Sequence, residues 1–134
     1  MSTTETTTGV SRVANVIIPV ADQDRRVDFY TESLGLEKRA DVPFGADVEG
    51  RWIEVAPSGS ETPIALCPPG PTNEAGGKDT GITLQTDDIE SYHARLAGRG
   101  VDVDAEVSRM GDPVPPLFWF RDPEGNQLMV VEVR

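Results

Sequence analysis

The feature that most constrains this chain is an internal repeat of about 65 residues in a sequence of 134. Shifting the sequence by 66 residues places Asn15 on Gly81, Val20 on Thr86 and Asp22 on Asp88. The same shift places residues 51–55 on residues 117–121, which pairs the "WI" of the first segment with the "FW" of the second. A repeat this short would leave an apolar sheet face uncovered, so the two copies are expected to share one core.

The first repeat opens with the pattern of a strand followed by a helix. Residues 13–20 form a β-branched run, and apolar residues then recur at helical spacing at Val27, Tyr30 and Leu34. Asp22 is an expected N-cap for a helix over about residues 23–33, and Gly35 is suited to a left-handed residue at its end.

The second repeat follows the same plan. Residues 81–86 are the expected strand, Asp87 or Asp88 the N-cap of the next helix, and Gly98 and Gly100 its end. This helix is expected to turn one face to the core, made by Ile89, Tyr92, His93 and Leu96.

The loop over residues 40–50, which carries Phe44, and the loop over residues 108–116 are expected to close over a cavity.

About three strands should complete each repeat, two of them joined by a turn containing glycine. The sequence thus predicts an α+β fold of two tandem βαβββ units forming an open, barrel-like sheet of about eight strands. Residues 1–11 are predicted to be a disordered tail, and residues 12–134 a single domain with unit one over 12–67, a linker over 68–80 and unit two over 81–134.

Composition excludes several classes of function. A formal net charge of −11 and scattered Lys and Arg residues argue against binding nucleic acid. No apolar run approaches the roughly 20 residues that span a bilayer, and the Thr-rich start has no secretion-signal pattern, so a cytoplasmic location without membrane contact is expected. A single Cys and a single His exclude an internal disulfide and any site with two histidines from one chain.

The helix ending in "FYTESLGL" (29–36) and the closing "FRDPEGNQLMVVE" (120–132) resemble the vicinal oxygen chelate superfamily of glyoxalase I, extradiol dioxygenases and bleomycin-resistance proteins. The resemblance covers about residues 12–134 and implies a U-shaped barrel whose concave face holds a ligand, usually within a homodimer. Both motifs are signatures of a fold and do not name a reaction.

Metal-dependent members of that superfamily hold an ion with four side chains, which the resemblance places at Asn15, Ala65, Gly81 and Met129. Two of these residues offer no donor side chain, and an amide and a thioether are poor ligands for divalent ions. Glu54 and Glu132 are carboxylates a few positions away, but strand alternation is expected to turn neighbouring residues, including Glu132, to the other face. The sequence therefore predicts no metal and no cofactor.

If those four positions face inward, the cavity is mostly apolar, with a few polar groups that would orient a ligand. Trp52 and Trp119 are candidates for stacking on a flat molecule, although strand aromatics more often belong to a core or an interface, and the sequence leaves open which face each occupies. Cys67 is expected to be a buried structural residue, His93 to pack on a helix, and no residue is assigned a catalytic role. The predicted ligand-binding residues are Asn15, Ile17, Trp52, Cys67, Thr83, Gln85, Trp119 and Met129.

These observations favour a protein that binds and sequesters a small organic molecule, such as an antibiotic or toxic metabolite, in a cavity formed by a homodimer. The alternative is a metal-dependent enzyme with atypical ligands, either a glyoxalase I-like lyase or a dioxygenase. A third class, an interaction module without a cavity, would instead present an apolar patch on its surface.

Overall fold

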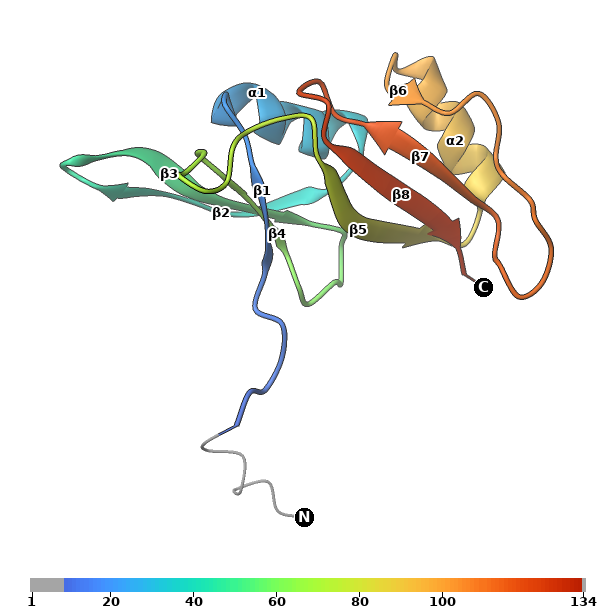
Figure 1. The fold of residues 1–134 in the computed structure, drawn as a ribbon, viewed down its shortest axis with the longest axis horizontal. Coiled ribbons are helices and arrows are strands. Elements are labelled where there is room, and N and C mark those ends of the chain that lie inside the picture. The colour runs from blue at the N-terminus through green and yellow to red at the C-terminus, as the bar shows by residue number, and fades with distance from the viewer. Residues whose placement is uncertain (1–8, 134) are drawn as a thin grey trace.

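The computed structural model describes residues 9–133 and contains two four-stranded sheets, one from each repeat. Sheet one has the order β1-β4-β3-β2, and sheet two has the matching order β5-β8-β7-β6. The equal order confirms an α+β fold of two tandem βαβββ units, which lie side by side in Figure 1. The strands of unit one are β1 (Val16–Pro19), β2 (Glu37–Gly45), β3 (Val48–Ala56) and β4 (Ile64–Cys67), and those of unit two are β5 (Asp79–Thr86), β6 (Asp102–Val103), β7 (Leu117–Arg121) and β8 (Gln127–Glu132).

The predicted first helix forms over the expected residues, but it consists of two consecutive segments of different helix type. An α-helix, α1 (Gln23–Asp28), continues into a π-helical segment, η2 (Phe29–Ser33). The Asp22 side chain accepts a hydrogen bond from the Arg25 backbone N–H at 3.1 Å, so the predicted cap is confirmed. Gly35 has a φ of +86°, the left-handed conformation that glycine adopts without a Cβ clash.

The second helix, α2 (Ile89–Gly98), is capped by Asp88, whose Oδ1 accepts from the Ser91 N–H at 3.1 Å. Ile89 and Leu96 are buried as predicted, whereas Tyr92 and His93 lie half-buried at the edge of the core. None of the helices described within residues 9–133 has the length and apolarity needed to cross a bilayer.

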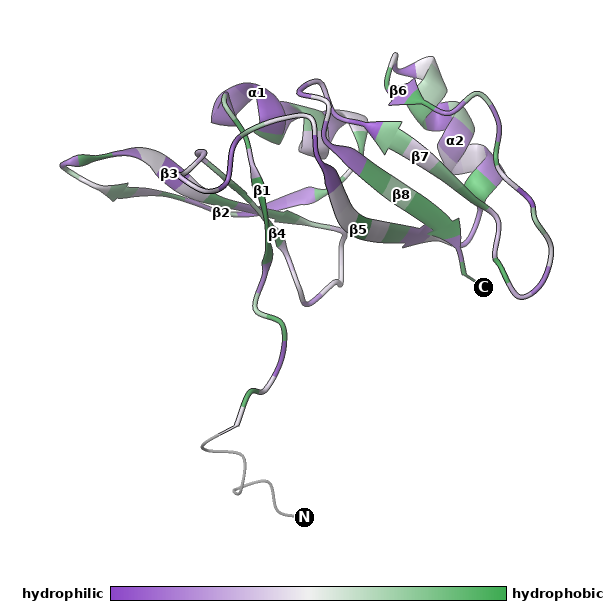
Figure 2. Cartoon of the chain, viewed as in Figure 1, coloured by the Kyte–Doolittle hydropathy of each residue, from purple (hydrophilic) through white to green (hydrophobic). Residues whose placement is uncertain are grey.

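One hydrophobic core serves both units. Its largest buried side chains come from both sheets and from the helices packed on them, and the apolar segments concentrate in β1, β4 and β8 (Figure 2). The core comprises Ile18, Val20, Val27, Tyr30, Leu34, Leu36, Ile53, Val55, Ile64, Leu66, Ile89, Leu96, Phe118, Phe120, Leu128 and Val130. This confirms the shared core that the repeat length required.

The turn between β7 and β8 joins the units (Figure 1). The Glu124 carboxylate accepts hydrogen bonds from the backbone N–H groups of Ala21, at 2.9 Å, and Asp22, at 3.2 Å, just before α1. The same carboxylate lies 3.2 Å from Nε of the buried Arg26, as an ion pair rather than a well-directed hydrogen bond. The "DPEGN" turn is therefore a structural contact between the units.

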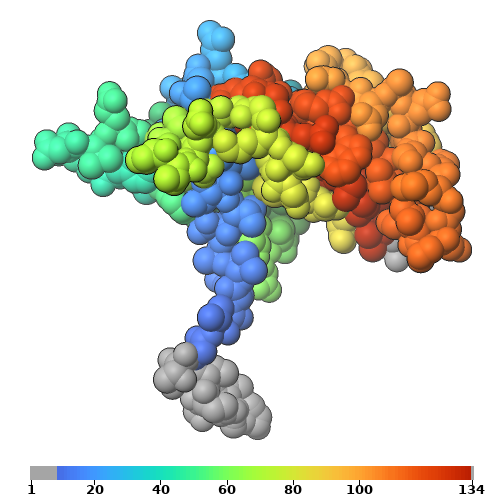
Figure 3. Space-filling model, in the orientation of Figure 1, coloured from blue at the N-terminus to red at the C-terminus, as the bar shows by residue number. Residues whose placement is uncertain are grey.

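The segment expected to form a loop over residues 40–50 is instead a β-hairpin, and this correction changes its role. β2 and β3 pair from Glu37 opposite Ala56 to Gly45 opposite Val48. The hairpin projects from the body of the molecule (Figure 3), and exposes Val42, Phe44 and Val48. Unit two has only the two-residue β6 and an irregular segment at 104–116, so the repeats differ most here.

Residues 1–8 of the predicted tail lie outside the described residues. The predicted linker corresponds to the chain between the end of β4 at Cys67 and the start of β5 at Asp79. The linker packs on the turn between β7 and β8, where the Gly77 N–H donates a hydrogen bond to the Glu124 carbonyl at 3.0 Å.

Candidate functional site

The face of sheet one that points away from the core carries a row of side chains across its strands. Ile17 on β1 lies opposite Ala65 on β4, which lies opposite Glu54 on β3. Because directly paired residues point to the same side of a sheet, these side chains share one face. Ile17 is 49% exposed, whereas its neighbour Ile18 is buried in the core.

Sheet two carries an equivalent row. Thr83 on β5 lies opposite Met129 on β8, which lies opposite Trp119 on β7. The buried neighbours Phe118, Phe120, Leu128 and Val130 belong to the core face, so this row also points away from the core.

The two rows correct the sequence alignment of the repeats. A uniform shift of 66 paired Trp52 with Phe118 and Ile53 with Trp119, but Ile53 and Phe118 are both fully buried on core faces. The equivalent of Glu54 is therefore Trp119, one position from the expected match. The offset is 66 between Ile17 and Thr83 but 65 between Glu54 and Trp119, so a single shift cannot align both rows.

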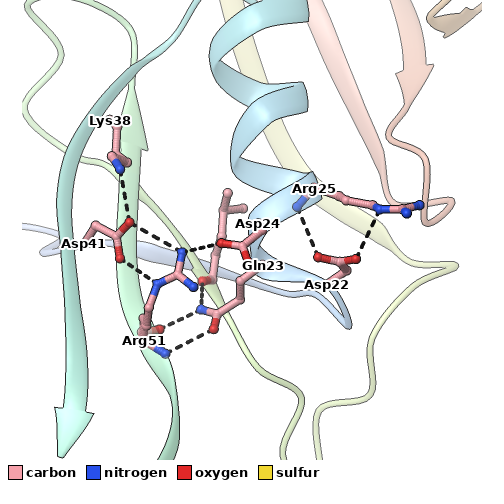
Figure 4. Close-up of polar contacts among 8 residues, drawn as sticks. Asp22, Gln23, Asp24, Arg25, Lys38, Asp41 and Arg51 are labelled. Atoms are coloured by element: carbon pink, nitrogen blue, oxygen red, sulfur yellow. Dashed lines mark hydrogen bonds and ion pairs between the residues drawn. The ribbon is translucent and has the colours of Figure 1, made fainter.

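The pairing also shows which face of its strand each tryptophan occupies. Trp52 is two residues before Glu54 on β3 and Trp119 lies opposite Met129, so both are on the faces that carry the rows. The position of Arg51, the residue before Trp52, explains the orientation of Trp52 (Figure 4). The Arg51 side chain lies on the helix side of the sheet. Its Nε is 2.8 Å from an oxygen of Asp41 on β2, and a terminal nitrogen is 2.8 Å from an oxygen of Asp24 on α1.

Gln23 fixes β3 against α1 and β4 in the same region (Figure 4). Its amide nitrogen donates to the carbonyls of Arg51 and Leu66 at 2.6 and 2.8 Å, and its oxygen accepts from the Arg51 N–H at 3.0 Å. With Arg51 held on the helix side, strand alternation sends Trp52 and Glu54 to the opposite, open side.

The predicted ligand-binding residues fall into two half-sites within one chain. Unit one carries Ile17, Trp52 and Cys67, with Asn15 just before β1, and unit two carries Thr83, Gln85, Trp119 and Met129. A groove of about 700 Å³ lies between the units, bounded by β5, Val16, Ile64 and residues 57–60. Of the predicted residues it includes only Thr83 and Gln85, so this groove does not bring the eight together.

The four positions that hold a metal in metal-dependent relatives do not fit one here. Ala65 has no donor atom and is fully buried, and Gly81 has no side chain and sits at φ +71° where the β5 register is irregular. Met129 and Asn15 supply a thioether and an amide, which are poor ligands for hard divalent ions. Among residues 9–133 no three His, Cys, Asp or Glu side chains are grouped to hold a metal ion.

The two nearby carboxylates behave differently. Glu132 faces the helix side, where its Oε2 accepts from the Ile89 N–H at 3.1 Å, as alternation predicted. Glu54 does not turn away: it lies opposite Ala65 on the open face, where its Oε2 accepts from Trp52 Nε1 at 2.8 Å. Alternation was expected to turn Glu54 away together with Glu132, and the pairing of Glu54 with Ala65 corrects that expectation.

Cys67 is buried and His93 packs on its helix against a core side chain, as expected. Burial raises the pKa of the Cys67 thiol, and the negative charge of Glu54 raises it further, so the thiol stays protonated and is a poor nucleophile. His93 packs edge-on against Phe118 with 4.9 Å between ring centres, and its Nε2 lies 2.7 Å from the Asp104 carbonyl oxygen.

Two repeated units, a shared core and an open face in each unit define a protein of the vicinal oxygen chelate type. Residues 12–130 match the sequence profile described as the Glyoxalase/Bleomycin resistance protein/Dioxygenase superfamily, and the chain belongs to this family.

The solved structures that resemble this chain include the following three. TnmS3, an antibiotic binding protein from Streptomyces sp. CB03234, is 36% identical with a TM-score of 0.80, covering 94% of this chain and 98% of that one. A glyoxalase/bleomycin resistance protein from the same organism is 37% identical, with a TM-score of 0.75 and coverage of 90% and 100%. A superfamily member from Sphaerobacter thermophilus DSM 20745 is 35% identical, with a TM-score of 0.82 and coverage of 92% and 98%.

Proposed function

We propose that this protein binds a small organic molecule, such as an antibiotic or toxic metabolite, without a metal ion, and protects the cell by sequestering it. The observation that carries the proposal is the make-up of the two rows, Ile17–Ala65–Glu54 and Thr83–Met129–Trp119. Apolar and aromatic surface with few polar groups is typical of sites that bind organic ligands by burial and stacking. The similarity to TnmS3, an antibiotic binding protein, supports the same function.

We propose further that the complete site forms in a cytoplasmic homodimer. Both rows point away from the core of their own chain, so a second copy is needed to place one row opposite another. The exposed apolar side chains of Ile17 on β1 and Val42 on the projecting hairpin would be covered by that copy. β1 and β5 are edge strands within the described residues, and each leaves one side available for pairing.

The rival function is a metal-dependent lyase or dioxygenase. It would require imidazole or carboxylate ligands, and the one carboxylate on an open-face row, Glu54, belongs to no group of three or more His, Cys, Asp or Glu side chains among residues 9–133. An interaction module without a ligand is the other rival, and it predicts that the dimer contains no accessible cavity.

A thermal-shift screen with transition metals, antibiotics and aromatic metabolites tests these functions together. A ligand at about 100 times its dissociation constant stabilises the folded protein by roughly 2.7 kcal/mol, which is easily detected. We expect stabilisation by organic molecules in the presence of a chelator. Stabilisation by metals alone, or about one transition ion per chain in protein purified without added metal, would contradict metal-independent binding.

A further inference from the structure

Unlike three other half-buried carboxylates, Glu54 has no cationic partner among the described residues. Asp41 pairs with Arg51 at 2.8 Å, Glu124 with Arg26 at 3.2 Å and Asp104 with Arg121 at 3.1 Å. Within residues 9–133 no Lys or Arg nitrogen lies within ion-pair distance of Glu54, and its one hydrogen bond comes from Trp52. Covering such a charge with ligand or protein is costly unless a partner compensates it.

The neighbours of Glu54 do not neutralise it. The residues directly across from it are Ala65 on β4 and Ala40 on β2, and the next along the row is Ile17. The Cys67 thiol nearby is protonated because burial raises its pKa. The open face of unit one therefore carries one negative charge in apolar surroundings, and the chain's net charge of −11 adds to the attraction for cations.

Trp52 adds an aromatic ring beside the Glu54 carboxylate. Its Nε1 donates to Glu54 Oε2 at 2.8 Å, which holds the carboxylate and the indole in one arrangement. That contact uses the edge of the ring and one carboxylate oxygen, and nothing described in residues 9–133 donates to the other oxygen. The face of an indole ring attracts cations, so ring and carboxylate favour the same kind of ligand group.

We infer that the ligand of this site is a flat organic cation, whose protonated nitrogen binds Glu54 and whose ring stacks on Trp52. The inference rests on the proposed binding function and adds the chemical class of the ligand. A protonated amine or ring nitrogen would give Glu54 the charge-assisted hydrogen bond that the protein itself does not supply.

The experiment uses a matched pair of probes, 9-aminoacridine, which is cationic at neutral pH, and acridine, which is neutral there. Their affinities for the full chain are measured by calorimetric titration at low ionic strength. Glu54→Gln keeps a carbonyl oxygen to accept the Trp52 N–H but removes the charge. Glu106→Gln, on an exposed segment of unit two, makes the same change in net charge elsewhere and serves as the control.

We expect the wild-type protein and Glu106→Gln to bind the cation roughly ten-fold tighter than the neutral probe, and Glu54→Gln to lose most of this preference. Equal affinities in the wild type, or a preference that survives Glu54→Gln, would overturn the inference. Binding of neutral aromatic molecules alone would contradict the inference that the ligand is a cation but would leave the proposed binding function in place. Failure of every organic molecule to bind, in both this titration and the thermal-shift screen, would contradict the inference and the proposed function together.

Discussion

The Tyr30 hydroxyl donates a hydrogen bond to Asp122 Oδ2 at 2.9 Å, linking residues that are 92 positions apart and both buried. Tyr30 lies in the helical segment of unit one, and Asp122 begins the turn after β7 in unit two. Asp122 Oδ2 also accepts from the Asn126 amide at 3.1 Å, and its Oδ1 accepts from the backbone N–H groups of Glu124 and Asn126. One carboxylate thus shapes the turn and joins it to the other unit.

Tyr30→Phe is expected to destabilise the protein by about 1–3 kcal/mol, because it removes a donor to a buried carboxylate while keeping the ring that packs in the core. Urea unfolding followed by circular dichroism measures the change. Tyr92→Phe is a matched control: the Tyr92 hydroxyl donates to the Leu34 carbonyl at 2.8 Å from a half-buried position, so a smaller loss is expected. Equal losses of unfolding free energy in the two variants would show that the hydrogen bond of Tyr30 to a buried carboxylate contributes no more than that of Tyr92 to a carbonyl.

High pH should weaken the fold through the same tyrosine. Burial raises the pKa of Tyr30 well above its usual value, and the neighbouring Asp122 carboxylate raises it further. Below about pH 10 the ring is protonated in both states, and above that value the unfolded chain loses its proton first, so stability falls as pH rises. Tyr92, whose pKa burial also raises, contributes in the same direction. The slope of unfolding free energy against pH above 10 should therefore be shallower in Tyr30→Phe than in the wild type, by up to about 1.4 kcal/mol per pH unit.

Glu124→Ala is expected to destabilise the protein by about 3 kcal/mol, because it leaves Arg26 buried without its partner and removes the acceptor of two backbone N–H groups. Glu61→Ala removes an exposed ion pair with Arg12 at 3.4 Å and should change stability little. Thermal unfolding of the two variants gives the comparison. Similar melting temperatures would contradict the role of Glu124 in joining the units.

Ile17→Glu tests the homodimer. A charge at the β1 end of the unit-one row would be buried without a partner if a second copy covers this face, so the variant should be monomeric while keeping its secondary structure. Light scattering after size exclusion measures the mass. Val10→Glu, at a position that is 95% exposed, is the control and should keep the wild-type mass. A wild-type protein that is monomeric at high concentration would contradict the proposed assembly.

Local patterns in the sequence were sufficient for much of the fold. Helical spacing and the Asp22 and Asp88 caps predicted both helices, and the repeat predicted paired units on one core. The "FYTESLGL" and "DPEGN" segments led to the correct family, and in the structure they meet through the hydrogen bond between Tyr30 and Asp122.

The β2–β3 hairpin was not predicted, because Pro43 and Gly45 are typical of loops. The Arg51 side chain on β3 pairs with Asp41 on β2 and also with Asp24 on α1, which is 27 positions away in the sequence. Local propensity gives no information on such contacts.

What the sequence determined by itself was the number of units, their helices and the absence of good metal ligands at the family's four positions, since these depend on residue types and short-range spacing. What only the tertiary structure decided was which face each strand residue occupies. A shift of one residue exchanges the two faces of a strand, and the offset between the two repeats changes from 66 at β1 and β5 to 65 at β3 and β7. For that reason Glu54 entered the candidate site only when its pairing with Ala65 was known.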